Sequence, residues 1–173
     1  PWLLIKFYSS QESKEIFSTK DVKHYWTDNI SPKLIALSLL YFFYIVTLHI
    51  LILFKGIYPV FGIFVCGIDG IYLIDISIMC LACLIWGTLR QRLWAWWGGV
   101  IFIGLFTVSI VVTFLKTNYT DMLSILSFPP VEMGILQALP IQGYHLAVLA
   151  GVPLFLTWVM AILSKRYYTN EIR

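Results

Sequence analysis

The sequence predicts an all-α integral membrane bundle of four transmembrane helices. Four long apolar stretches carry this prediction, at residues 34–54, 57–89, 93–115 and 144–164. Each has at least the roughly 20 residues that cross a hydrocarbon core of about 30 Å. The chain of 173 residues is 60% hydrophobic and only 12% charged, which is about half the usual charged share. We therefore expect an N-terminal segment at 1–32, one membrane domain at 33–164 and a tail at 165–173.

Basic residues gather on one side of these stretches. Only Lys55 and Lys116 fall on the other side. The remaining basic residues are Lys6, Lys14, Lys20, Lys23, Lys33, Arg90, Arg92, Lys165, Arg166 and Arg173. Because Lys and Arg are retained in cytoplasmic loops, this split predicts that both termini and the 90–92 turn are cytoplasmic. The 116–143 loop is then external.

The N-terminal segment is predicted to lie at the membrane interface. Ser9 and Glu12 form a capping box that predicts a short helix ending near Phe17. Residues 18–32 mix charges with aromatic side chains, which suits a chain lying at headgroup level. Residues 1–8 are expected to be either an interfacial anchor or the inner end of a helix that precedes this chain.

The second apolar stretch is longer than one crossing requires. Residues 57–89 would extend about 50 Å if they were helical throughout. Pro59, Gly62, Gly67 and Gly70 favour a break, so we predict a bend or a helix end between Gly67 and Gly70, with 58–68 at the outer interface or dipping in and turning back. A single long, tilted helix is the alternative.

Two further features concern packing and the long loop. Small residues that allow close helix approach are Gly98, Gly99, Gly104 and the pairs Cys83/Gly87 and Ala147/Gly151. In the 116–143 loop, the Pro129-Pro130 pair precedes a predicted short helix at 131–139 that lies flat on the outer surface.

Trp94, Trp96 and Trp97 lie just beyond Arg90 and Arg92. Tryptophans beside basic residues at the end of a span form an interfacial belt, so we predict that these five residues anchor the cytoplasmic side. A nucleotide or cation cage is the alternative interpretation.

The candidate site is a polar intramembrane cluster of His49, Asp69, Asp75 and His145. Helical rise places all four toward the outer half of the bundle, and His49 and Asp75 at similar depth on consecutive helices. Because a lone carboxylate facing lipid is unfavourable, we expect Asp75 to face the bundle interior and to meet His49.

Three interpretations of this cluster compete. The first is a structural clasp that fixes helix register, and the second is a proton or cation site built on Asp75 and His49. The third is a haem, chlorophyll or metal site with His49 and His145 as ligands. The C-x-x-C of Cys80 and Cys83 lacks a second pair, so these thiols are expected to be small packing residues.

Residues 7–17, with Trp26 and Ser31-Pro32, and residues 89–97 resemble uncharacterised small multi-spanning membrane proteins of bacteria. The resemblance implies a bacterial inner membrane and no particular activity. We hypothesise an accessory or partner-binding membrane subunit, with the lipid bilayer and a membrane protein as partners and no nucleic acid. A proton, cation or porphyrin site protein is the second hypothesis. The third hypothesis is an enzyme, which ranks last because no nucleophile–base pair or metal cluster stands out.

Overall fold

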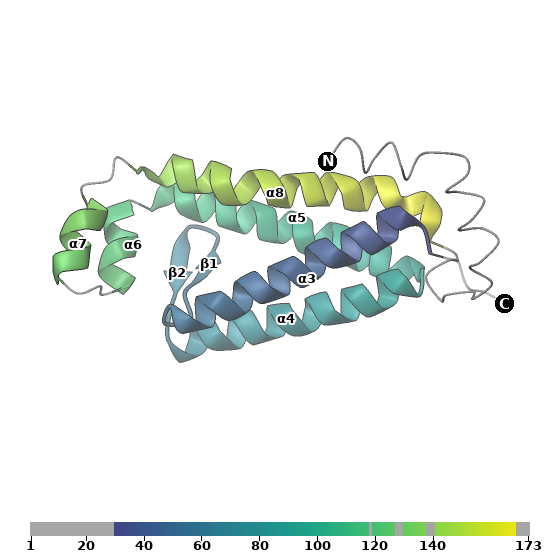
Figure 1. Ribbon diagram of the computed structural model, residues 1–173, viewed down its shortest axis with the longest axis horizontal. Helices are drawn as coiled ribbons and strands as arrows, with labels where there is room; N and C mark the ends of the chain where they lie inside the picture. Colours follow the sequence, from purple (N-terminus) through teal and green to yellow (C-terminus); the bar gives the residue numbers. More distant parts are fainter. Residues whose placement is uncertain (1–29, 118, 127–129, 138–140, 169–173) are drawn as a thin grey trace, which may run out of the picture. The chain divides into compact units, whose positions relative to one another are not determined.

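The computed structural model describes residues 30–117, 119–126, 130–137 and 141–168. The predicted helix at 9–17, the interfacial segment at 18–29 and most of the tail lie outside these residues. The described chain is an all-α bundle, as predicted. Four of its helices are long and apolar enough to cross a membrane: α3 (Pro32–Leu53), α4 (Ile68–Leu89), α5 (Leu93–Lys116) and α8 (Gly143–Leu163) (Figure 1).

The helices pack as two neighbouring pairs. The more extensive contact joins α5 to α8, and the other joins α3 to α4 (Figure 1). Small residues allow the first pair to approach closely, as predicted. A Cβ at Gly104 would lie 2.8 Å from Nε1 of Trp158, and one at Gly151 would lie 2.7 Å from the Val111 side chain.

The apolar core runs along the inner faces of the four helices. Apolar side chains at helical spacing fill it: Leu37, Tyr41, Tyr44, Leu48, Ile74, Leu81, Leu84, Ile103, Phe106, Ile110, Leu154 and Ala161. A buried hydrogen bond of 2.7 Å joins Tyr44 Oη to Thr157 Oγ1 and links α3 to α8. Thr157 Oγ1 also donates to Pro153 O, so this polar pair is satisfied inside the core.

The break in the second apolar stretch is confirmed. Helix α4 begins at Ile68, directly after Gly67, whose φ of 72° lies in the left-handed region. Instead of a helix, the preceding residues form an antiparallel hairpin of β1 (Tyr58–Val60) and β2 (Ile63–Val65), in which Tyr58 faces Val65. The alternative of one long helix from 57 to 89 is therefore wrong, and the hairpin itself was not predicted.

The long loop contains two short helices. One is α7 (Pro130–Gln137), which covers most of the predicted helix at 131–139, and the other is α6 (Tyr119–Leu126), which was not predicted. A 3-10 turn, η2 (Ser164–Tyr167), follows α8. We call the end of the bundle with β1, β2, α6 and α7 the hairpin end. The opposite end carries Lys33, Arg90, Arg92, Lys165 and Arg166, and we call it the basic end (Figure 1).

Candidate functional site

The predicted polar cluster does not form inside the bundle. His49, Asp69, Asp75 and His145 are all exposed on the surface of the chain. Asp75 faces outward, so the prediction that it faces the interior is wrong. The sequence did not predict its direction, because the buried positions of α4 include Gly70, Ile74, Ser77, Leu81 and Leu84 and Asp75 falls between them.

His49 and His145 each bond to nearby backbone of their own segment. His49 Nδ1 lies 2.8 Å from Ile45 O, one turn earlier on α3. His145 Nδ1 accepts a hydrogen bond of 3.1 Å from the Gln142 backbone N–H at the start of α8, where the two residues form a capping box. Across the described parts of the chain, no group of three His, Cys, Asp or Glu residues could hold a metal ion.

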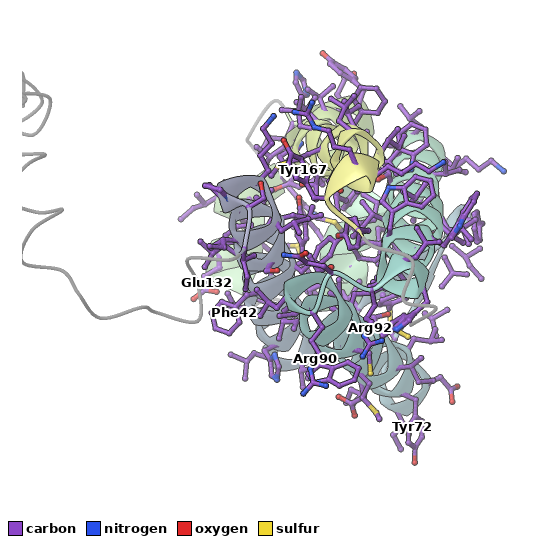
Figure 2. The ribbon with its side chains drawn as sticks, turned by 90° about the vertical axis from the view of Figure 1, so that its right-hand side faces the viewer. Phe42, Tyr72, Arg90, Arg92, Glu132 and Tyr167 are labelled. Carbon is purple, nitrogen blue, oxygen red and sulfur yellow. The ribbon has the colours of Figure 1, made fainter. Side chains whose placement is uncertain are left out.

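Asp75 lies in an outward stripe of α4. The stripe repeats every three or four residues, as one face of a helix does, and comprises Ile68, Tyr72, Asp75, Met79, Ala82 and Trp86. Tyr72 and Met79, one turn to either side of Asp75, are 63% and 69% exposed, and Tyr72 projects away from the bundle in Figure 2. No hydrogen bond or ion pair joins the Asp75 carboxylate to another described residue. Asp75 lies about 10 Å along α4 from Ile68, well inside the apolar length of the helix.

The cysteines also differ from expectation. Cys80 and Cys83 are exposed free thiols on α4 and do not pack inside the bundle. Of the predicted small-residue pair Cys83/Gly87, only Gly87 allows a close approach, since a Cβ there would meet Ala95 and Trp94 of α5. Cys66 lies beside the hairpin, where burial raises the pKa of its thiol.

Hydroxyl groups take the place of the predicted ionisable cluster inside the hairpin end. Ser109 Oγ of α5 accepts a hydrogen bond of 3.1 Å from Phe61 N–H and donates one of 2.9 Å to Pro59 O. Thr113 Oγ1 accepts one of 2.9 Å from Gly62 N–H. These hydroxyls satisfy backbone groups of the hairpin, which is non-helical and packs against the apolar helix α5.

Helix α4 also contacts the hairpin through a hydroxyl: Tyr58 Oη lies 2.7 Å from Ser77 Oγ of α4. Ser77, Ser109 and Thr113 were not predicted, because the predicted cluster consisted only of ionisable residues. The four-residue spacing of Ser109 and Thr113 places both hydroxyls on one face of α5, and this spacing could have indicated a polar contact there.

The predicted tryptophan belt is partly wrong. Trp94 and Trp97 are 48% and 52% exposed, as an interfacial anchor requires. Trp96, however, is buried, and its Nε1 donates a hydrogen bond of 2.9 Å to Ala161 O of α8. Trp86 of α4 supplies an exposed ring that the prediction omitted: the Arg90 guanidinium lies 4.4 Å from its centroid.

A second group of cations lies where α3 begins and α8 ends. The Arg166 guanidinium and Lys33 Nζ lie 4.9 Å and 5.8 Å from the centroid of the Tyr167 ring. Arg166 Nη2 also donates a hydrogen bond of 2.7 Å to Tyr167 Oη. Figure 2 views this end of the molecule, with Tyr167 on one side and Arg90 and Arg92 on the other.

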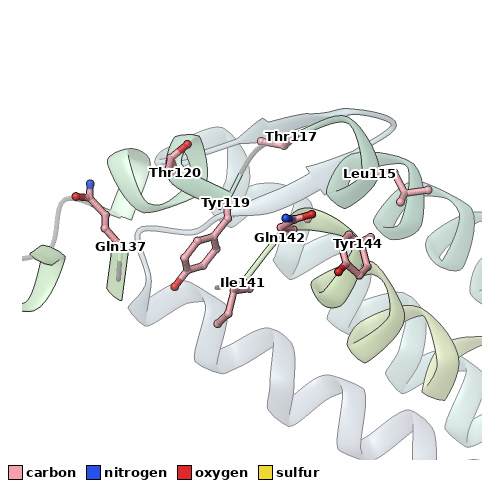
Figure 3. A pocket seen from close by; sticks show the side chains of 9 residues that line it. Leu115, Thr117, Tyr119, Thr120, Gln137, Ile141, Gln142 and Tyr144 are labelled. Atoms are coloured by element: carbon pink, nitrogen blue, oxygen red, sulfur yellow. The ribbon is translucent and has the colours of Figure 1, made fainter. Parts of the chain in front are cut away.

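An open cleft of about 430 Å³ lies at the hairpin end, between the start of α8, the end of α5 and the short helices (Figure 3). Uncharged residues line it: Leu115, Thr117, Tyr119, Thr120, Gln137, Ile141, Gln142, Gly143 and Tyr144. None of Asp69, Asp75 and His49 lines the cleft. The cleft is therefore separate from the outward stripe.

The fold and these surfaces define a helical bundle with four helices that are long and apolar enough to cross a membrane. Comparison with protein-family models, with curated proteins and with solved structures found no match for this chain.

Proposed function

We propose that this chain is a membrane subunit that binds a second membrane protein through the outward stripe of α4. The observation that carries the proposal is Asp75, an exposed carboxylate within the apolar length of a helix and without a described polar partner. An Asp at the centre of a membrane helix is disfavoured by about 2.5–3.5 kcal/mol on insertion scales, and Asp75, about 10 Å from the start of α4, carries a smaller part of this penalty. A partner helix with a basic or hydrogen-bond-donating side chain at the same depth would remove much of this penalty.

The chemistry of the stripe supports a protein partner over lipid alone. Tyr72 and Met79 flank the carboxylate with side chains that pack adaptably against a helix, and Ala82 is small enough to allow close approach. Hydrogen bonds between membrane helices contribute only about 0.6–2 kcal/mol, so Asp75 would fix the register of the complex while packing provides the rest of the affinity.

The proposed setting is a bacterial inner membrane with both termini in the cytoplasm. Within the described part of the chain, five basic residues lie at the basic end and only Lys55 and Lys116 at the other. This distribution supports the orientation under the positive-inside rule. A cysteine introduced at Thr120 should then react with an impermeant thiol reagent added from outside, in a chain whose own cysteines are replaced, whereas one at Gln91 should not. The reverse labelling pattern would overturn the orientation.

The partner proposal is tested by photocrosslinking in native membranes. p-Benzoylphenylalanine at Tyr72 should yield one discrete crosslinked product, whereas the same group at Phe155, which is 50% exposed on α8, should not. A product of twice the monomer mass would identify a second copy of this chain as the partner. Crosslinking to lipid alone at both positions would contradict the proposal.

Matched carboxylate variants sharpen this test. Asp75→Leu should reduce the yield of the Tyr72 crosslink roughly 3- to 30-fold, because it removes the polar contact at the centre of the stripe. Asp69→Leu removes an exposed carboxylate from the first turn of the same helix and should leave the crosslink intact. Equal loss in both variants would indicate a general change in α4.

Asp75 also supports a second candidate function, a proton or cation site. A carboxylate within an apolar helix is the kind of group that proton and cation pathways in membranes use. Asp75→Asn keeps the shape and hydrogen bonding of the side chain but cannot titrate. A partner interface should tolerate this change to within a few-fold in crosslinking yield, whereas proton uptake on complex formation should disappear.

A further inference from the structure

We propose that Lys33, Arg166 and Tyr167 form a binding site for the phosphate of an anionic phospholipid at the basic end of the bundle. The site is built from two elements that are far apart in sequence, since Lys33 lies in the first turn of α3 and Arg166 in η2, after α8. Tyr167 holds them together: both cations lie within 5.8 Å of its ring centroid, and its hydroxyl accepts a hydrogen bond from Arg166.

The positive charge at the basic end favours binding of an anion. Lys165 lies on the same turn as Arg166, with its Nζ 5.0 Å from the centroid of the Trp96 ring of α5, so η2 carries a third cation at this end. Over residues 30–168, the carboxylates that the structure describes are Asp69, Asp75, Asp121 and Glu132, and all four belong to elements of the hairpin end or to the outer part of α4. Clustered like charges repel, and a phosphate between Lys33 and Arg166 would relieve that repulsion.

Backbone geometry adds to the attraction. Helix α3 begins at Pro32, so the free N–H groups of its first turn and the positive end of its dipole lie beside Lys33. The guanidinium of Arg166 can contact phosphate oxygens with two N–H groups, whereas Lys33 supplies a single charged ammonium.

The surroundings favour a lipid over a free phosphate ion. The cluster lies at the ends of two candidate membrane spans, the level at which headgroups lie. From there α3 continues with exposed Leu39 and α8 carries exposed Leu163 directly before η2. Acyl chains could cover such side chains, and inorganic phosphate would leave them bare. Basic clusters at the cytoplasmic ends of spans are typical sites for anionic headgroups.

The test measures lipid retention by the full chain. Protein purified in mild detergent is supplied with phosphatidylglycerol or phosphatidylcholine, and bound lipid is counted by native mass spectrometry. We expect the wild type to retain phosphatidylglycerol preferentially. Lys33→Gln with Arg166→Gln should reduce its apparent affinity roughly 30-fold, the effect of losing two basic contacts.

The matched control carries the same change in charge at the hairpin end, Lys55→Gln with Lys116→Gln, and should retain phosphatidylglycerol as the wild type does. Equal loss in both double variants would overturn the proposal in favour of diffuse attraction to a basic protein. Tyr167→Phe keeps every charge and removes only the hydroxyl that holds Arg166, so an intermediate loss is expected. Unchanged retention in the Lys33/Arg166 variant would refute the site.

A last arm distinguishes the source of the phosphate. Millimolar inorganic phosphate should displace little phosphatidylglycerol if the acyl chains contribute to binding. Complete displacement, together with thermal stabilisation by phosphate alone, would assign the site to a free anion and overturn the lipid proposal. Because none of these residues belongs to the outward stripe of α4, either outcome leaves the Asp75 crosslinking test unaffected.

Discussion

The two ends of the bundle satisfy their internal polar groups with different side chains. At the basic end, helices meet helices directly, and aromatic donors join them: Trp96 Nε1 donates to Ala161 O, Trp158 Nε1 donates to Val100 O, and Tyr168 Oη donates to Thr88 Oγ1. At the hairpin end, a non-helical segment packs against α4 and α5, and aliphatic hydroxyls satisfy its backbone. The difference follows from what must be bonded, since helices carry few free backbone groups along their length whereas a two-stranded hairpin leaves one edge of each strand free.

This comparison also explains where the charges lie. Hydroxyls and indoles satisfy the described interior, apart from the buried Ser38 Oγ, which has no hydrogen-bond partner there. Ionisable side chains are left at the surface, where water, headgroups or a partner can meet them. Both proposed binding sites accordingly lie on the surface of the bundle.

The largest expected effect comes from Gly70, which fixes the hairpin end. A Cβ at this position would collide with the backbone oxygens of Gly56 and Val65, and backbone atoms cannot move aside cheaply. Gly70→Ala should therefore lower the free energy of unfolding by about 3 kcal/mol or more. Thermal unfolding in detergent measures the loss. Gly134→Ala on α7 is the control, because a Cβ there meets nothing within 4 Å.

The next prediction concerns the hydroxyls that hold the hairpin. Ser109→Val leaves Phe61 N–H and Pro59 O without their partner, and Thr113→Val leaves Gly62 N–H without its own. Each buried group left unsatisfied should lower stability by about 1–3 kcal/mol. Amide hydrogen exchange at residues 58–65 should accelerate in both variants.

Thr107→Val provides the control on the same helix. The Thr107 hydroxyl donates only to Ile103 O of its own helix, so its loss should leave exchange in the hairpin unchanged. Faster exchange in all three variants would indicate general loosening of α5 and would remove the special role assigned to Ser109 and Thr113.

At the basic end, two tryptophans next to each other should differ in effect. Trp96 is 7% exposed and donates to Ala161 O, whereas Trp97 is 52% exposed. Trp96→Phe should lower the free energy of unfolding by about 1–2 kcal/mol, because it leaves a buried carbonyl with one partner fewer and a gap in the core. Trp97→Phe should change it by about 0.5 kcal/mol or less. Similar losses would place both rings in one interfacial belt, as the sequence predicted.

The sequence predicted the membrane-spanning helices well because length and hydropathy determine them. Helices α3, α5 and α8 begin and end within two residues of the predicted stretches, and the break before α4 followed from the length of 57–89 and from Gly67. The hairpin could not be predicted, since its strands have three residues each and depend on Ser109 and Thr113, about 50 residues away in sequence. Propensity within so short a segment is weaker than these tertiary contacts.

The direction of side chains was the weakest part of the prediction. The depth of Asp75 follows from counting residues, but its direction depends on which face of α4 meets α3 and α5. The apolar residues of a membrane helix do not reveal that face, because lipid and protein interior are equally apolar. The same limit explains Trp96, whose neighbours Trp94 and Trp97 face outward.

The smallest expected effect is a pH dependence at Tyr168, just beyond α8. Its ring is 8% exposed, and burial raises the pKa of the phenol above its usual value of about 10. The neutral phenol is therefore favoured in the folded chain. Its contribution to stability is complete below about pH 10 and is lost as the pH rises further, because the unfolded chain ionises first. Between about pH 9.5 and 11, the wild type should lose thermal stability more steeply than Tyr168→Phe, which retains the ring but cannot ionise. Parallel curves would mean that the Tyr168 phenol is equally solvated in the folded and unfolded chain, so that the basic end is more open to water than its aromatic contacts indicate.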